Sequence, residues 1–144
     1  LFDLTNKVAL ITGSSKDIGR AIAEEMARQG AKVVISSRKA DVCQEVADGI
    51  NAEAKASGNA TGEAIVIPAH VGQRDALQHL VDETRERLGQ IDILVCNAAV
   101  NPFYGSMQDL PDDAMDKILD INIKSNQFTH IKYNFSWYPV WYIL

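Results

Sequence analysis

The chain has 144 residues, 47% of them hydrophobic and 23% charged, with a formal net charge of −5. These values indicate one globular domain and exclude a disordered or collagen-like chain. The acidic balance argues against a nucleic-acid-binding surface, and no stretch approaches the roughly 20 apolar residues that span a membrane. The two cysteines suggest no disulfide framework and no signal peptide is recognisable, so we expect a cytoplasmic protein without a metal site.

Short apolar runs alternate with longer amphipathic segments along the chain. Strands are predicted from runs rich in Val and Ile at residues 8–12, 33–36, 65–67 and 91–95. Helices are predicted where apolar residues recur at three- and four-residue spacing, from Ile18 to Gly30, around Val42 to Ile50, from Leu77 to Leu88 and from Pro111 to Phe128. Residues 52–62, rich in Ala, Gly, Ser and Asn, indicate the end of the second helix and an exposed loop.

The alternation of four strands with helices predicts a parallel sheet with helices on both faces. The strands are continuously hydrophobic, which indicates that both sides of the sheet are buried. Right-handed crossovers then favour an α/β fold of the Rossmann type, an open doubly wound sheet. We therefore expect residues 1–130 to form a nucleotide-binding domain on these strands.

The last residues, 131–144, depart from this pattern. They hold both tryptophans and several other aromatic residues, and Pro139 cannot donate a hydrogen bond to a central strand. An ordinary buried C-terminal segment is one interpretation. We favour the alternative that this aromatic-rich tail is an altered terminus, which would leave the edge of the fourth strand exposed for association.

The first predicted strand runs into the sequence Thr12-Gly13-Ser14-Ser15-Lys16-Asp17-Ile18-Gly19. Glycines at a strand-to-helix turn let the backbone bend sharply and approach a phosphate group without a Cβ atom in the way. The free N–H groups and the positive dipole end of the following helix favour a pyrophosphate. A purely structural helix start would look similar, but the strand before and the helix after favour a nucleotide-binding loop.

This loop is similar to the Thr-Gly-x-x-x-Gly-Ile-Gly cofactor motif of the short-chain dehydrogenases/reductases. Two further segments, Cys96-Asn97-Ala98-Ala99 and Asp120-Ile121-Asn122, resemble the family's Asn-Asn-Ala-Gly motif and the helix that carries its catalytic asparagine. The segment from Asn97 to Phe103 looks most like the NADP-dependent carbonyl and retinal reductases. The resemblance implies hydride transfer between a nicotinamide and a small carbonyl or alcohol substrate, and a homo-oligomeric complete enzyme.

The resemblance assigns a cofactor-binding role to residues that follow the predicted strands. They are Gly13, Ser14, Ser15, Lys16, Ile18 and Gly19 in the loop, Ser37, Arg38 and Lys39 after the second strand, His70 and Val71 after the third, and Asn97, Ala98 and Ala99 after the fourth. The small residues after the fourth strand could instead serve only close helix packing. Asn122 is unfavourable within a helix and could face solvent, but the resemblance assigns it to the catalytic tetrad, where it holds a water in the proton relay.

Three positions depart from the family pattern. Asp17 replaces the second glycine of the loop, and we expect its side chain to cap the following helix rather than to repel the pyrophosphate. His70 replaces the aspartate that contacts adenine, and it retains the ability to donate a hydrogen bond. Ala99 replaces a glycine, which is a small change.

The charges after the second strand distinguish NADP(H) from NAD(H). A free ribose 2′-hydroxyl is typically bound by an acidic residue at this place, whereas a 2′-phosphate requires cations. The strand ends in Ser36-Ser37-Arg38-Lys39 without an acid, and Lys16 lies in the loop that faces the same region. Arg38 and Lys39 could be no more than solvated loop charges, but the missing acid and the flanking cations predict NADP(H).

The family's catalytic serine and its Tyr-x-x-x-Lys motif have no counterpart in the chain. None of Tyr104, Tyr133, Tyr138 and Tyr142 is followed by a lysine four residues later. The family's general acid would then be missing, and such catalysis contributes about 10²–10⁴-fold. Two alternatives to an active enzyme therefore stay open: a catalytically silent nucleotide-binding or interaction protein produced by truncation, and a non-functional product of marginal stability.

Overall fold

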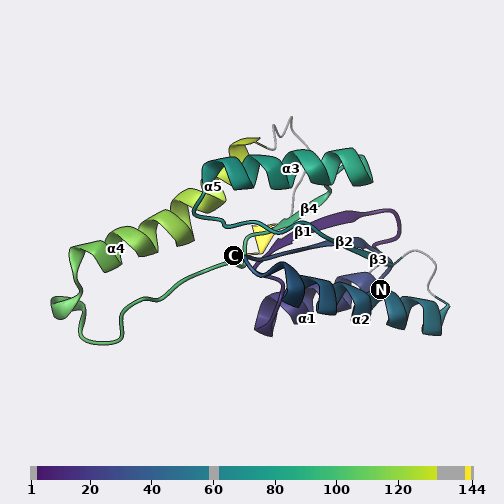
Figure 1. Cartoon of the computed structure of the whole chain (residues 1–144), viewed down its shortest axis with the longest axis horizontal. Helices are drawn as coiled ribbons and strands as arrows, with labels where there is room; N and C mark the ends of the chain where they lie inside the picture. Colours follow the sequence, from purple (N-terminus) through teal and green to yellow (C-terminus); the bar gives the residue numbers. More distant parts are fainter. Residues whose placement is uncertain (1–2, 59–61, 133–141, 144) are drawn as a thin grey trace.

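The computed structural model describes residues 3–58, 62–132 and 142–143, and a parallel sheet lies between two layers of helices (Figure 1). The strands are β1 Val8–Thr12, β2 Lys32–Ser36, β3 Glu63–Val66, β4 Ile93–Val95 and β5 Tyr142–Ile143. The helices are α1 Asp17–Arg28, α2 Ala40–Ser57, α3 Arg74–Leu88, α4 Asp112–Leu119 and α5 Ser125–Lys132. A π-helix, Asp120–Lys124, joins α4 to α5, and a 3₁₀ turn, Met107–Asp109, precedes α4.

The strand order is β3-β2-β1-β4-β5, and all of the pairings between neighbouring strands are parallel. The chain builds outward from β1 through β2 to β3, and then returns to the other side of β1 with β4. This reversal makes the carboxyl ends of β1 and β4 the topological switch point, where open α/β sheets bind their ligands. The predicted doubly wound Rossmann-type sheet is confirmed.

The hydrophobic core occupies both faces of the sheet. Val33 and Ile35 of β2 pack with residues of α1 and α2, whereas Val34 packs on the other face with residues of α3. This alternation follows from the two-residue period of a strand. Figure 1 shows α1 and α2 below the sheet and α3 and α5 above it. Burial of each such side chain stabilises the fold by about 1.5–3 kcal/mol, which explains why the middle positions of β1 and β2 are apolar.

Several predicted boundaries were wrong by a few residues. Helix α2 continues to Ser57, inside the segment 52–62 where the end of the helix and a loop were predicted, because the alanines, glutamate and lysine there are good helix formers. It ends where Gly58 adopts a left-handed conformation with φ of 70°. Strand β3 begins two residues earlier than predicted, and β4 begins two residues later.

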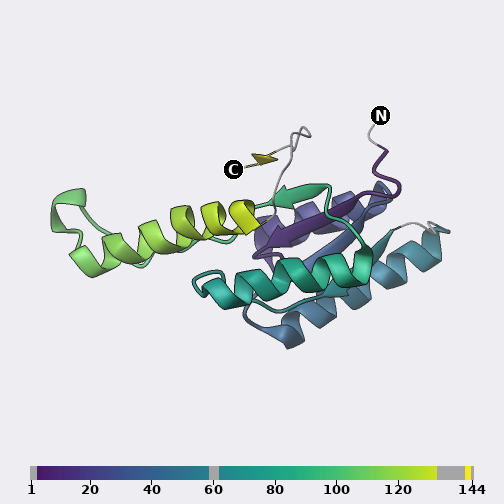
Figure 2. The same ribbon diagram turned by 90° about the horizontal axis from the view of Figure 1, so that it is seen from above.

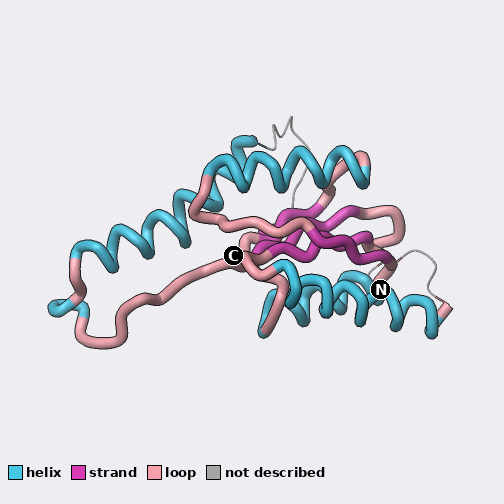
Figure 3. The backbone as a smooth tube through the Cα atoms, viewed as in Figure 1, coloured by secondary structure: helices cyan, strands magenta, loops and turns pink. Residues whose placement is uncertain are grey.

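The predicted helix over residues 111–128 forms as α4, the π-helix and α5 in succession. Helix α5 packs beside α3, whereas residues 101–119, called the arm below, project away from the sheet (Figures 1 and 2). The arm begins as an irregular segment, and Figure 3 shows it as a long loop before α4. No helix within the described ranges is long and apolar enough to cross a membrane.

The C-terminal tail contributes one short strand. Tyr142 and Ile143 pair in parallel with Leu94 and Val95, so β5 covers part of the β4 edge that we expected to be exposed. The strand lies at the edge of the sheet, where a short pairing is tolerated. Pro139 and both tryptophans, on which the tail prediction was based, lie outside the described residues.

Candidate functional site

The glycine loop is attached to the end of β2 by a buried serine. The Ser14 hydroxyl donates to the carbonyl of Ile11 at 2.8 Å and accepts from the backbone N–H of Ser36 at 2.9 Å. The backbone N–H of Ser14 also donates to the carbonyl of Ser36 at 3.2 Å. Gly13 allows this turn because its φ of 69° lies in the left-handed region. Three hydrogen bonds therefore fix the loop that the sequence predicted to bind a pyrophosphate.

The same loop is attached to the end of β4 by Asn97. The side-chain amide of Asn97 donates to the carbonyls of Thr12 and Gly13, both at 3.1 Å. In return, the Thr12 hydroxyl accepts from the backbone N–H of Ala98 at 3.1 Å and donates to the carbonyl of Val95 at 3.3 Å. These bonds join the chain segments that leave β1 and β4, so the switch point is held rigidly.

Gly19 lets the first turn of α1 pack onto this junction. A Cβ atom at Gly19 would lie 2.4 Å from the Asn97 side-chain nitrogen and 2.4 Å from the Gly13 carbonyl oxygen. At Gly13 it would lie 3.0 Å from the Cα atom of Ala98. Any side chain at Gly19 would thus push α1 away and move its free N–H groups from the loop. Gly13 and Gly19 are therefore needed for the packing of the loop against α1 and Asn97, in addition to giving a ligand access to the backbone.

The predicted capping role of Asp17 was wrong. The N-terminal cap of α1 is Lys16, which makes no side-chain capping hydrogen bond, and Asp17 is the first helical residue. Asp17 has φ of 50°, a left-handed conformation that side chains rarely adopt, although Asp tolerates it better than most residues. Its carboxylate points into solvent, 3.6 Å from the ammonium group of Lys16. The backbone of Asp17 therefore has a conformation that glycine adopts without strain, and the side chain turns outward.

The residues after β2 present two cations to solvent. Arg38 and Lys39 are exposed, and no acidic residue lies between Ser36 and Lys39. Ser37 supports this turn, because its hydroxyl accepts from the backbone N–H of Lys39 at 3.3 Å and lies 3.1 Å from the buried Cys43 sulfur. The Ser14 bonds to Ser36 place the glycine loop beside the same turn. The cations Arg38 and Lys39 therefore lie close to the free backbone N–H groups at the glycine loop. This arrangement suits a phosphorylated ribose.

The segment after β3 lies alongside the end of β2. The backbone N–H of Ala69 donates to the carbonyl of Ser37 at 3.1 Å, which continues the pairing beyond the strands. His70, the predicted adenine contact, and Val71, a predicted cofactor contact, follow directly and are half-buried. The backbone N–H of Gly72 donates to Nδ1 of His70 at 3.0 Å. The His70 ring is therefore held in place by its own loop.

The side chain of Asn122 binds the segment after β4. Its Oδ1 atom accepts from the backbone N–H of Val100 at 2.9 Å, and its Nδ2 atom donates to the Val100 carbonyl at 3.0 Å. The side-chain amide of Asn126 donates in turn to the Asn122 carbonyl at 2.8 Å. Asn122 lies within the π-helix, a form that is frequent at functional sites. It thus positions the segment from Asn97 to Val100, and its catalytic role stays a prediction.

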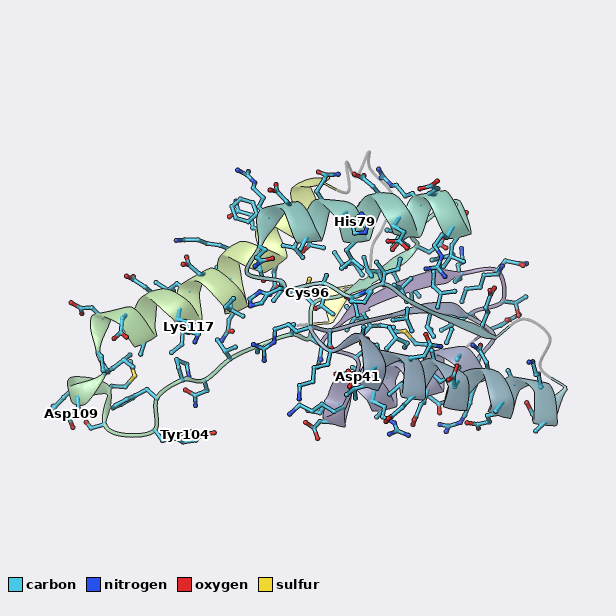
Figure 4. The ribbon with its side chains drawn as sticks, viewed as in Figure 1. Asp41, His79, Cys96, Tyr104, Asp109 and Lys117 are labelled. Atoms are coloured by element: carbon cyan, nitrogen blue, oxygen red, sulfur yellow. The ribbon has the colours of Figure 1, made fainter. Side chains whose placement is uncertain are left out.

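Cys96 lies between β4 and Asn97, and Figure 4 shows it beside the sheet, far from Tyr104 and Asp109 at the tip of the arm. Partial burial raises the pKa of its thiol to about 11. The thiol is therefore neutral at physiological pH and a poor nucleophile. Two predicted cofactor contacts, Ala99 and Ile18, are exposed, and Ile18 is 71% exposed.

The sequence reasoning missed two residues of the site. Thr12 appears in the predicted motif, but its role in joining β1 to β4 became visible in the structure, since its partners are more than eighty residues away. Ser36 has a buried hydroxyl without a hydrogen-bond partner in the described part of the chain. A polar residue at the end of an otherwise apolar strand is the signal that could have pointed to either position.

The strand order, the glycine loop at the switch point and the helix start behind it are typical of dinucleotide-binding α/β proteins. The family model for short chain dehydrogenases matches residues 7–130. The chain therefore belongs to the short-chain dehydrogenase/reductase family.

Relatives are similar over most of this chain. Dehydrogenase/reductase SDR family member 4 of Bos taurus is 45% identical over 123 residues, which cover 85% of this chain and 41% of that protein. Dehydrogenase/reductase SDR family member 2, mitochondrial, of Homo sapiens is 44% identical over 122 residues, with coverage of 85% and 41%. The chain thus spans about two fifths of the length of these relatives.

Solved structures share the fold. A short-chain type dehydrogenase/reductase from Mycobacterium marinum has a TM-score of 0.80 and 37% identity, with 92% of this chain and 49% of that chain covered. RhlG of Pseudomonas aeruginosa, in an active-site complex with NADP, has a TM-score of 0.80 and 27% identity, with coverage of 92% and 48%. A 3-ketoacyl-(acyl-carrier-protein) reductase from Brucella melitensis, complexed with NADH, has a TM-score of 0.79 and 27% identity, with coverage of 90% and 49%. These neighbours include complexes with either nicotinamide cofactor.

Proposed function

We propose that residues 1–130 form the NADP(H)-binding domain of an oxidoreductase that transfers hydride between a nicotinamide and a small carbonyl or alcohol substrate. When bound, the nicotinamide supplies or accepts the hydride. The residues of this chain would bind and orient the cofactor. The loop from Gly13 to Gly19 would bind its pyrophosphate, and Arg38 and Lys39 would bind its 2′-phosphate. The segment from Asn97 to Ala99 would line its nicotinamide half. The resemblance to carbonyl and retinal reductases supports this substrate class.

One observation carries the choice of NADP(H): exposed Arg38 lies two residues after the end of β2, next to the glycine loop, and no acid stands beside it in the sequence. An arginine forms two parallel hydrogen bonds with a phosphate, whereas a carboxylate at this place would favour a free 2′-hydroxyl. Lys16 supports the same preference, because its ammonium group adds a positive charge to the loop. Its ion pair with the exposed carboxylate of Asp17 is weak, so the ammonium group stays available to a phosphate.

The test is a titration of the protein with NADPH and NADH. We expect tighter binding of NADPH, and Arg38→Gln should reduce the preference by about tenfold, as expected for one charged hydrogen-bonding partner. Lys55→Gln is the matched control, because it removes one positive charge at the far end of α2. Tighter binding of NADH by the unchanged protein would refute the assignment, and so would an Arg38→Gln variant that behaves like Lys55→Gln.

A second candidate is a catalytically silent nucleotide-binding or interaction protein. It is consistent with the site described above, whose glycine loop and strand ends would serve nucleotide binding without catalysis. Intact mass and peptide mapping of the natural protein across residues 125–144 distinguish the two candidates. A longer species that carries a Tyr-x-x-x-Lys motif supports the reductase, and a terminus at Leu144 supports the silent protein.

We further propose that the protein is a homo-oligomer. Met115, Leu119 and Ile123 are 37%, 43% and 59% exposed at a spacing of four residues, and they form an apolar stripe on and just after the arm. Exposed apolar stripes of this kind are typical of association surfaces. Light scattering of the protein and of Leu119→Glu tests the proposal, and a monomer in both cases would refute it.

A cytoplasmic location also stays a prediction, because one human relative is named as mitochondrial.

A further inference from the structure

Two successive residues of the π-helix contact two different loops of the candidate site. Asn122 binds Val100, in the segment after β4, through both polar atoms of its side-chain amide, at 2.9 and 3.0 Å. Ile121 is buried and lies against the loop after β3, where a Cβ atom at Gly72 would be 2.6 Å from its Cδ1 atom. The π-helix therefore connects the loops that follow β3 and β4, and its shape determines where Asn122 points.

The wider turn of the π-helix changes the partners of the backbone carbonyls. In an α-helix the backbone N–H of Ser125 would donate to the carbonyl of Ile121, four residues earlier. Here it donates to the carbonyl of Asp120, five residues earlier. The carbonyl of Ile121 thus loses its ordinary backbone partner, and a buried carbonyl without any partner would destabilise the turn.

The side chain of Ser125 supplies the missing partner. Its hydroxyl donates to the carbonyl of Ile121, and the residue is only 2% exposed. Ser125 thus serves two carbonyls at once, that of Asp120 through its N–H and that of Ile121 through its hydroxyl. The next carbonyl, that of Asn122, accepts from the side-chain amide of Asn126 at 2.8 Å. Both residues that contact the loops therefore have their carbonyls paired with side chains one turn further on.

Without the Ser125 hydroxyl, an ordinary α-helix would be favoured over this segment, because its backbone pairs each carbonyl in turn. Helix α5 is held on α3, where the guanidinium of Arg74 lies 4.4 Å from the ring centroid of Phe128 (Figure 1). The residues before Ser125 would therefore have to turn about the helix axis, by up to about 100°, the rotation of one residue. The side chain of Asn122 would then no longer face the segment after β4.

We propose that Ser125 is a positioning residue for Asn122, the predicted catalytic asparagine. Its hydroxyl holds the π-helix, and the π-helix directs the Asn122 amide to Val100. The segment from Asn97 to Val100 is thereby fixed where it would line the nicotinamide half of the cofactor. The effect on cofactor binding rests on the proposed function, whereas the effect on Val100 is independent of it.

The first test is hydrogen exchange at the Val100 amide, measured without cofactor. Ser125→Ala removes only the hydroxyl, and exchange should become about tenfold faster, the effect of one lost hydrogen bond. Thr129→Val is the matched control, because it removes another buried hydroxyl, which donates to the Ser125 carbonyl at 2.8 Å within α5. It should leave exchange at Val100 unchanged. Equal exchange rates in the two variants would show that the Ser125 hydroxyl has no special effect on Val100, and would overturn the proposal.

A double variant shows whether Ser125 acts through Asn122. In protein that already carries Asn122→Ala, Ser125→Ala should not accelerate exchange at Val100 further, because the amide that Ser125 positions is absent. A positioning role requires this loss of additivity, whereas a general contribution to stability does not. A further acceleration in the double variant would mean that Ser125 acts on Val100 by another route, and the proposal would be wrong.

Titration with NADPH gives the functional readout. Ser125→Ala should weaken the binding of NADPH by about three- to tenfold, and Thr129→Val should not. An unchanged affinity in Ser125→Ala would refute the link between Ser125 and the cofactor. Failure of the unchanged protein to bind NADPH or NADH would instead refute the proposed function, and hydrogen exchange at Val100 would still decide the role of Ser125.

Discussion

Asn122 satisfies both backbone polar groups of Val100, accepting from its N–H at 2.9 Å and donating to its carbonyl at 3.0 Å. The two residues lie on different elements, one in the π-helix and the other in the segment that leaves β4. The side chain thus replaces a strand partner for this segment. We call this pair of hydrogen bonds between Asn122 and Val100 the clamp. Because Asn97 and Ala98 precede Val100 by a few residues, the clamp fixes their position relative to the glycine loop.

Removal of this clamp should free the segment. We expect Asn122→Ala to lower the free energy of unfolding by about 1–3 kcal/mol, because both polar groups of Val100 lose their partner. Hydrogen exchange at the Val100 amide should also become faster. Asn101→Ala, at an exposed neighbouring position, is the control and should change stability by less than about 0.5 kcal/mol. Unchanged protection of the Val100 amide in Asn122→Ala would contradict the clamp.

Two glycine-to-alanine substitutions should have opposite effects. Gly19→Ala places a Cβ atom 2.4 Å from the Asn97 amide nitrogen and should destabilise the protein by about 1–3 kcal/mol. Gly49→Ala lies in α2, where a Cβ atom meets nothing within 4 Å, and should stabilise it by about 0.5–1 kcal/mol. Urea unfolding of both variants measures the difference. The packing argument fails if the two substitutions shift the midpoint in the same direction.

Asp17 should weaken both folding and cofactor binding. Asp17→Gly relieves the left-handed conformation at φ of 50° and should raise the free energy of unfolding by up to about 1 kcal/mol. It also removes a negative charge from the phosphate loop, so NADPH should bind roughly two- to tenfold more tightly at low salt. Asp17→Asn separates the two effects, since it removes the charge and tolerates the same conformation. Weaker NADPH binding by both variants would show that the carboxylate assists the site.

The thiol of Cys96 should titrate at unusually high pH. Burial raises its pKa to about 11, so its alkylation rate should still rise tenfold per unit between about pH 8 and 10. In the urea-unfolded chain the same rate should level off near pH 8.5. Because the folded pKa is higher than the unfolded pKa, the folded form binds more protons in this window, and stability falls as the pH rises above about 8.5. A plateau near pH 8.5 in the folded protein would refute the shift.

The sheet could be predicted from the sequence because it depends on local patterns. Runs such as Val33–Ile35 are long enough in β-branched residues to define a strand, and the order of strands and helices limits the topology. The glycine loop was also predictable, since Gly13 and Gly19 stand at a strand-to-helix junction. These features need no knowledge of distant contacts.

The remaining details of the site depend on contacts between distant residues. Asn122 and Val100 are 22 positions apart, and no periodicity indicates that a helix asparagine binds a strand end. The left-handed conformation of Asp17 occurs where the loop bonded to β2 and β4 enters α1, and the sequence of the loop does not indicate it. The sequence placed the end of α2 only within residues 52–62, and it is the left-handed conformation of Gly58 that ends the helix there.

The position of β1 between β2 and β4 has a consequence for folding. β2 follows β1 after one short helix, whereas Val8 contacts Asp92, next to β4, across 84 positions. The entropy lost in closing a loop grows with its length, and distant pairings slow the folding of a chain. The half of the sheet made by β1, β2 and β3 can therefore assemble before β4 arrives. The hydrogen bonds that join the ends of β1 and β4 would then be completed last.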